Sequence, residues 1–199
     1  MKLYMSPTSP YSRKARVVAR EKGLAPEEII VNPWESPGEL VTRNPLSRIP
    51  VLEQDSGRCL FDSKVIVEYL DSLNDSPRLI PPGEDRFAVL SWQALADGIM
   101  DAVLARMRET QRPETQRSEE WAQRQEAALE RALDVAAADC ATPLVGKAFT
   151  LADIALGVAL EYVDLRYGSE WRAAHPGLAE WHEGVAARES FRATAPPAQ

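Results

Sequence analysis

The N-terminal part of the chain alternates short apolar runs with a helical pattern. Residues 3–5 are an apolar run that predicts a strand over residues 2–5. Apolar side chains then recur at three- and four-residue spacings, which predicts a helix over residues 10–23 that ends at Gly23. A β-branched run predicts a second strand over residues 28–31. A strand, a helix and a strand at this spacing form a βαβ unit with a right-handed crossover.

The pattern continues with a hairpin and a second helix. Pro50 precedes a short apolar run and predicts a strand over residues 51–53, because proline is tolerated at the first residue of a strand. A polar turn leads to a return strand over residues 59–61. Asp62 and Ser63 then begin a helix whose apolar positions continue to Leu73. This part of the chain therefore predicts an α/β domain.

A domain boundary follows this helix. Residues 74–85 contain three prolines and a glycine, so no helix or strand can run through them. After this segment the strand patterns stop and only helical patterns remain. We therefore predict an N-terminal domain over residues 1–76, a linker over residues 77–85 and an all-helical domain over residues 86–199.

The predicted all-helical domain contains one strong sequence signal for the start of a helix. Apolar residues from Val89 to Val103 predict a long helix that ends before Pro113, and further helices are expected over residues 118–139 and 176–187. Between these two, Thr150 is a candidate N-cap and Asp153 stands at the N3 position of a capping box. The residues after this box are apolar on nearly all sides, so we expect this helix at the centre of the bundle.

Composition and charge exclude several classes of function. The chain has 199 residues, of which 45% are hydrophobic, so a packed core is expected. The net charge of −7 argues against a nucleic-acid partner, which needs a basic surface. We expect no membrane partner, because no apolar run approaches the roughly 20 residues of a membrane span. We expect reduced thiols and a cytoplasmic location, because the chain has two cysteines and no visible signal peptide. The two histidines stand apart, so no metal site is expected.

The turn over residues 6–13 is the first candidate for chemistry. Ser9 is a suitable N-cap, because its hydroxyl can accept a hydrogen bond from the open amides of the first helical turn. Pro10 then takes the first helical position, where a missing N–H costs nothing. A helix N-terminus carries about +0.5 of an elementary charge and favours anions. The alternative is that Ser9 is a helix cap and nothing more.

This turn also resembles a known site. Ser9-Pro10-Tyr11-Ser12 is similar to the Cys-Pro-Tyr-Cys of glutaredoxins with both sulfurs replaced by oxygens. A serine cannot exchange disulfides, but its hydroxyl can donate a hydrogen bond to the thiolate of another molecule. The chain thus resembles serine-type members of the glutathione S-transferase family along its whole length. The resemblance implies a thioredoxin-like N-terminal domain followed by an all-α helical C-terminal domain.

The same resemblance implies how glutathione is held. The Ile-Pro-Val-Leu segment resembles a thioredoxin-type segment with a cis proline, so the backbone of Ile49 beside Pro50 would pair with the cysteinyl part of glutathione. Asp62 would bind the γ-glutamyl ammonium, Ser63 the neighbouring carboxylate, and Arg48 the glycyl carboxylate. The simpler alternatives are an ordinary loop before an edge strand, a helix cap and a solvated cation.

The remaining expectations concern the reaction. Ser9 would stabilise the glutathione thiolate, and Tyr11, Met107 and Arg108 would line a pocket for the electrophile. The implied function is an enzyme that conjugates glutathione, its co-substrate, to small electrophiles without a metal. The family also implies a homodimer. The alternatives are a non-catalytic binding or interaction module and a glutathione-dependent isomerase or dehalogenase.

Overall fold

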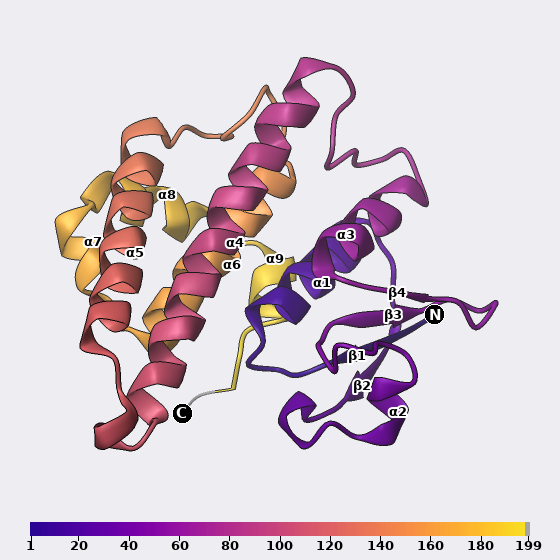
Figure 1. The fold of residues 1–199 in the computed structure, drawn as a ribbon. Coiled ribbons are helices and arrows are strands. Elements are labelled where there is room, and N and C mark those ends of the chain that lie inside the picture. The colour runs from indigo at the N-terminus through magenta and orange to yellow at the C-terminus, as the bar shows by residue number, and fades with distance from the viewer. Residues whose placement is uncertain (198–199) are drawn as a thin grey trace. The chain divides into compact units, whose positions relative to one another are not determined.

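The computed structural model describes residues 1–197, which form two compact units (Figure 1). The first unit comprises residues 1–80 and the chain from Arg188 onward, and the second comprises residues 81–187. A mixed four-stranded sheet in the order β2-β1-β3-β4 lies in the first unit. Its strands are β1 (Lys2–Met5), β2 (Glu27–Ile30), β3 (Val51–Glu53) and β4 (Cys59–Leu60). β1 runs parallel to β2 and antiparallel to β3, and β3 is antiparallel to β4.

Helices cover both faces of this sheet. The helical segments of the unit are α1 (Pro10–Glu21), η1 (Pro33–Glu35), α2 (Gly38–Val41), α3 (Ser63–Ser72) and α9 (Glu189–Arg192). Figure 1 shows α1 and α3 on one side of the sheet and α2 on the other. Tyr4 and Val51 form a buried cluster with Val31 and with Leu40 of α2. The expected βαβ unit is present, because β1, α1 and β2 follow in order and the two strands pair in parallel.

α1 ends as its sequence predicts. Gly23 has a φ of +66°, a conformation that glycine adopts without strain. The amide of Leu24 donates to the carbonyl of Ala19 at 2.8 Å, and the amide of Gly23 donates to the carbonyl of Arg20 at 2.9 Å. These two bonds form a Schellman motif, which satisfies carbonyls that the helix end would otherwise leave open.

α9 packs against α1 through polar contacts. Arg13 donates to the carbonyl of Phe191 at 3.2 Å. Arg188 donates two hydrogen bonds to the carboxylate of Glu21, at 2.9 and 2.7 Å, and the Ser190 hydroxyl donates a third at 2.5 Å. The structure therefore groups residues 188–197 with the sheet, whereas the sequence pattern assigned the whole of 86–199 to the helical domain. A four-residue helix is too short to show a periodic pattern, so the sequence carries no signal for it.

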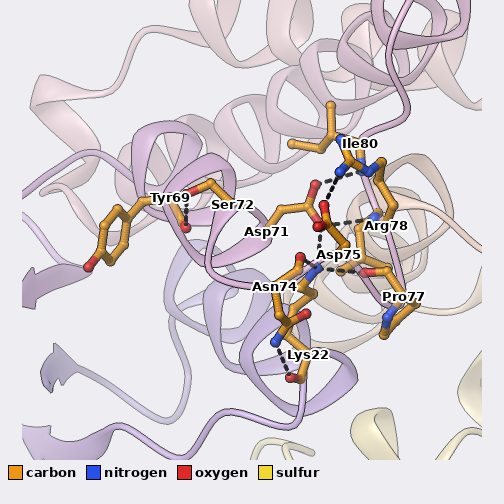
Figure 2. Close-up of polar contacts among 10 residues, drawn as sticks. Lys22, Tyr69, Asp71, Ser72, Asn74, Asp75, Pro77, Arg78 and Ile80 are labelled. Carbon is orange, nitrogen blue, oxygen red and sulfur yellow. Dashed lines mark hydrogen bonds and ion pairs between the residues drawn. The ribbon is translucent and has the colours of Figure 1, made fainter.

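A buried ion pair holds the segment after α3 (Figure 2). The ammonium of Lys22 donates to a carboxylate oxygen of Asp71 at 3.0 Å and to the carbonyls of Asn74 and Pro77 at 2.7 and 2.6 Å. The Asp71 carboxylate also accepts from the backbone amides of residues 79–80 at 2.9 and 3.0 Å. Every one of these groups has a partner, so the proline-rich segment up to residue 80 is tied to α1 and α3.

The second unit is helical, as predicted. Its segments are α4 (Glu84–Gln111), η2 (Glu114–Gln116), α5 (Glu119–Asp139), α6 (Leu151–Arg166), α7 (Glu170–Ala174) and α8 (Pro176–Ala186). α4 packs against both α5 and α6, and α6 also contacts α8. Every residue of α6 from 151 to 160 is buried, so the central position expected for this helix is confirmed. The sequence pattern missed α7, which has only five residues.

The capping box of α6 is formed. The amide of Thr150 donates to the Asp153 carboxylate at 2.8 Å, and the amide of Ala152 donates to the Thr150 hydroxyl at 3.3 Å. The second carboxylate oxygen of Asp153 accepts from the amide of Leu144 at 3.0 Å. Asp153 therefore closes the helix start and also holds the loop before it.

α4 is long and apolar enough to cross a membrane by length and composition alone. An 18-residue window within it has a mean hydropathy of 1.3, and 44% of that window is buried inside the protein. A single helix of this kind also occurs as the core helix of soluble bundles. The expectation of no membrane partner therefore stays a prediction.

Candidate functional site

Strand register brings three turns to one end of the sheet. β1 ends at Met5, and Tyr4 is paired with Val51, the first residue of β3. β3 pairs in turn with β4 so that Leu52 lies opposite Leu60, the last residue of β4. The turn after β1, the turn before β3 and the turn after β4 therefore emerge at the same end of the sheet. These are the turns that carry the residues predicted to hold glutathione.

Ser9 occupies the N-cap of α1. Its hydroxyl accepts a hydrogen bond from the amide of Ser12 at 3.2 Å, and Pro10 follows at the first helical position. A hydroxyl that accepts one bond keeps its own proton for another acceptor. Ser9 is also partly exposed, so this proton can reach a ligand.

Two other hydroxyls of this turn, those of Ser12 and Thr8, are less suited to that task. Ser12 is fully buried, so its hydroxyl cannot reach solvent. The Thr8 hydroxyl lies 3.4 Å from the Ser6 hydroxyl and shares a hydrogen bond with it. Tyr11, at the start of α1, is half-buried to the same degree as Ser9. Ser9 thus combines exposure with a position at the positive end of the helix dipole.

The turn before β3 is held by a buried asparagine. The Asn44 side chain donates to the carbonyl of Arg48 at 2.8 Å and accepts from the amide of Leu46 at 3.0 Å. The Ile49–Pro50 peptide bond is cis, as the family resemblance implied. Sequence reasoning did not single out Asn44, although an Asn-Pro dipeptide is a recognised turn signal. Arg48 itself is exposed.

The turn after β4 ends in the N-terminus of α3. Asp62 is the N-cap, and its carboxylate accepts from the amide of Lys64 at 3.0 Å. Ser63 takes the first helical position and is buried, whereas Asp62 is exposed. An exposed carboxylate and an open helix N-terminus offer one group for an ammonium and another for a carboxylate.

A second polar cluster, also missed from the sequence, joins the sheet to the chain around α2. The Tyr4 hydroxyl donates to Glu53 at 3.0 Å, and Arg43 donates to the same oxygen at 2.6 Å. The Arg43 guanidinium lies 4.5 Å from the centre of the Tyr4 ring. The hydrogen bond from Arg43, followed by that from Tyr4, holds the pKa of the Glu53 carboxyl below its usual value. This cluster fixes the chain between α2 and the turn before β3.

The two remaining predicted pocket residues lie in the helical unit. Met107 is half-buried and Arg108 is exposed, both near the C-terminal end of α4. Within residues 1–197 there is no group of three or more His, Cys, Asp or Glu side chains that could hold a metal ion.

Both halves of the chain match models of one family. Residues 3–78 match the glutathione S-transferase N-terminal domain, and residues 119–184 match the glutathione S-transferase C-terminal domain. The predicted fold class is therefore confirmed, with a mixed four-stranded sheet and its helices followed by an all-helical domain.

Several relatives are similar to this chain over its full length. The chain is 38% identical over 200 residues to the GST-like protein YibF of Escherichia coli (strain K12), with 99% of each chain covered. It is similar to a glutathione S-transferase structure from Methylobacillus flagellatus KT with GSH bound, with a TM-score of 0.92 and 40% identity over 98% of this chain and 99% of that one. A glutathione transferase family member from Pseudomonas fluorescens Pf-5, solved with bound S-(propanoic acid)-glutathione, has a TM-score of 0.86 and 38% identity, with 100% of both chains covered. Because the family models and the relatives agree on both halves, this chain belongs to the glutathione S-transferase family.

Proposed function

We propose that this protein binds glutathione at the end of the sheet where the three turns meet and conjugates its thiolate to small electrophiles. The observation that carries the proposal is the Ser9 hydroxyl, which caps α1 at 3.2 Å from the Ser12 amide and keeps its proton for a ligand. Glutathione-bound relatives of nearly the same length support the choice of ligand.

Each turn takes one part of glutathione in this proposal. Ser9 donates to the sulfur, and the backbone of Ile49 beside Pro50 pairs with the cysteinyl part. Asp62 binds the γ-glutamyl ammonium, and Ser63 with the first amides of α3 binds the carboxylate beside it. Arg48 is exposed and reaches the glycyl carboxylate.

The energies are sufficient for thiolate formation. A free thiol has a pKa of about 8.5, and lowering it by about two units needs roughly 2.7 kcal/mol. A hydrogen bond to a charged group contributes about 1.5–3 kcal/mol. The helix N-terminus adds roughly 0.3–1 kcal/mol. Ser9 then acts as a donor to an anion and not as a general base.

The proposed pocket for the electrophile is lined by Tyr11, Met107 and Arg108. The relative that binds S-(propanoic acid)-glutathione supports a small electrophile that carries a carboxylate. We also propose a cytoplasmic homodimer, on the strength of the family resemblance.

The test is a titration of the thiolate absorbance of bound glutathione in the parent protein and in Ser9→Ala. We expect Ser9→Ala to raise the pKa of bound glutathione toward its free value and to slow conjugation of an aryl halide by about 10–100-fold at neutral pH. Thr8→Ala is the matched control, because it removes the neighbouring hydroxyl of the same turn. Coincident titrations of the parent and Ser9→Ala would reduce Ser9 to a helix cap.

The same preparation separates the alternatives. A protein that is not retained on immobilised glutathione overturns the proposal. Retention without turnover of any aryl halide indicates a non-catalytic module. Turnover confined to isomerisation or dehalogenation substrates keeps the thiolate chemistry and replaces the conjugation step.

A further inference from the structure

Arg13, in α1, is a buried residue that links Ser9 to the C-terminal part of the same compact unit. Its backbone amide donates to the carbonyl of Ser9 at 2.9 Å, which closes the first turn of the helix. Its guanidinium donates to the carbonyl of Phe191 at 3.2 Å and to the hydroxyl of Thr194 at 3.5 Å. One residue therefore closes the turn that begins at Ser9 and also joins that turn to α9.

The contacts of the Arg13 side chain lie in the interior of this unit. Arg13 is 4% exposed, Phe191 is 1% exposed and Thr194 is fully buried. The guanidinium lies 5.6 Å from the centre of the Phe191 ring. The Thr194 hydroxyl is itself held, because it donates to the carbonyl of Ser190 at 2.8 Å. A buried guanidinium that gave up such bonds would leave costly unsatisfied donors, so these contacts hold the start of α1 against α9.

α9 is also joined to α1 at the opposite end of that helix. Arg188 donates two hydrogen bonds to the carboxylate of Glu21, at 2.9 and 2.7 Å, and the Ser190 hydroxyl donates a third at 2.5 Å. Glu21 is the last residue of α1, roughly three helical turns from Ser9. The two anchors hold the same segment, but of the two it is Arg13 that closes the turn carrying Ser9.

We propose that Arg13 is a positioning residue for Ser9 and keeps its hydroxyl directed at the sulfur of bound glutathione. The inference rests on the proposed function and deepens it, because it adds a residue that acts without touching the substrate. The Ser12 amide holds the hydroxyl oxygen of Ser9 at 3.2 Å, and the Arg13 amide holds its carbonyl. The anchor to α9 keeps both amides in place. Hydrogen bonds weaken steeply when they are misaligned, so movement of this turn weakens the bond to the thiolate.

Two simpler explanations compete with this inference. In the first, Arg13 attaches α9 and does nothing else, so its loss lowers stability and leaves the pKa of bound glutathione unchanged. In the second, the positive charge of Arg13 acts on the thiolate directly through space, so its effect persists when the Ser9 hydroxyl is absent. The experiment therefore changes Arg13 both with and without that hydroxyl.

The measurement is the thiolate absorbance of bound glutathione against pH in the parent, Arg13→Gln, Ser9→Ala and the double variant. We expect Arg13→Gln to raise the pKa of bound glutathione by about 1 and to slow conjugation at neutral pH about threefold, because less thiolate is present. The Michaelis constant for glutathione should stay within about twofold of the parent value, since the ends of the ligand are held elsewhere. In the Ser9→Ala background the same change should raise the pKa by less than about 0.3, because Arg13 acts through Ser9.

Arg188→Gln is the matched control. It breaks the anchor at the other end of α1, so it should lower the midpoint of urea unfolding and leave the pKa of bound glutathione at the parent value. If Arg13→Gln does not fold, Arg13→Lys decides, because lysine keeps the charge and the aliphatic stem but lacks the planar fork that reaches two acceptors. Arg13→Lys should raise the pKa by about half as much as expected for Arg13→Gln.

The outcomes separate this inference from the function on which it rests. Coincident titrations of the parent and Arg13→Gln, or of the parent and Arg13→Lys, overturn the positioning role and leave the Ser9 chemistry intact. An equal rise in Arg188→Gln also overturns it, because any loosening of α9 would then have the same effect. A full rise in the Ser9→Ala background assigns the effect to charge and overturns it as well. Coincident titrations of the parent and Ser9→Ala overturn the proposed role of Ser9 and this inference together.

Discussion

The ammonium of Lys22, at the end of α1, lies 3.0 Å from the carboxylate of Asp71 on α3, and both groups are buried. The pair is complete only because the backbone supplies the remaining partners, two carbonyls for Lys22 and two amides for Asp71. Charges taken out of water in this way are stable only when every hydrogen-bonding position is used.

Lys22→Met should therefore destabilise the protein strongly. The variant leaves the Asp71 carboxylate buried without its counter-charge, which typically costs about 3–5 kcal/mol. The measurement is the free energy of unfolding from urea denaturation. Arg20→Met is the matched control, because Arg20 is exposed and its contact with Glu28 at 3.7 Å should contribute less than about 1 kcal/mol. Equal midpoints for the two variants would show that the buried pair adds nothing to stability.

Asp153→Ala should lower stability by about 2 kcal/mol or more. The change removes the acceptor of two backbone amides, those of Thr150 and Leu144, and each lost bond of this kind costs about 1–3 kcal/mol. Refolding should slow, and turnover of the folded enzyme should stay near that of the parent. Glu120→Ala, at an exposed position in the first turn of α5, is the control and should unfold like the parent. Unchanged melting of Asp153→Ala would mean that the box does not support the fold.

Asp62→Asn should raise the Michaelis constant for glutathione more than it lowers the maximal rate. Asparagine is as good an N-cap as aspartate, so α3 should keep its start while losing the charge for the γ-glutamyl ammonium. Ser63→Ala tests the neighbouring carboxylate contact in the same way. A loss of binding energy remote from the sulfur appears in the Michaelis constant. A lower maximal rate at unchanged affinity would contradict this placement.

Glu21 should make stability depend on pH. Burial raises the pKa of its carboxyl, but the hydrogen bonds from Arg188 and Ser190 outweigh burial and hold it below the ordinary value of 4.5. A depressed pKa in the folded state contributes stability that is present in full above about pH 4.5 and is lost as the pH falls through the folded-state value.

Unfolding free energies from pH 7 to pH 3 check this expectation. The difference between the parent and Glu21→Gln should shrink at the acid end of the series. Glu189→Gln, at an exposed neighbouring position, should follow the parent curve. A constant difference between the parent and Glu21→Gln across the series would rule out the linkage.

Local signals in the sequence account for much of the fold. Ser9-Pro10, Gly23 and the Thr150–Asp153 box each act within one turn of chain, so residue type alone predicts where these helices begin or end. Long-range contacts are different. The link between Lys22 and Asp71 spans 49 residues, and nothing in either neighbourhood marks these two charges as partners.

The candidate site likewise has features that local sequence signals predict and features that depend on long-range contacts. The three turns could be predicted singly, from caps and from the family resemblance, but their meeting at one end of the sheet follows only from strand register. Within residues 1–197 the buried Nε atom of Arg166 has no hydrogen-bond partner. The sequence could not predict this, because an arginine at a helix end looks the same with or without a partner. The hydrophobic pattern of the sequence predicts which residues a helix buries. Only the packed structure shows which buried polar atoms lack a hydrogen-bond partner.

The contacts of α9 bear on the order in which this protein is made. Residues 188–197 complete the unit that contains the sheet, yet a ribosome adds them after the whole of the helical unit. Vectorial synthesis usually lets an N-terminal domain finish folding first. Here Arg13 and Glu21 cannot form their hydrogen bonds with Phe191 and Arg188 until the C-terminal residues have been synthesised. The unit that contains the sheet is therefore synthesised first but completed last.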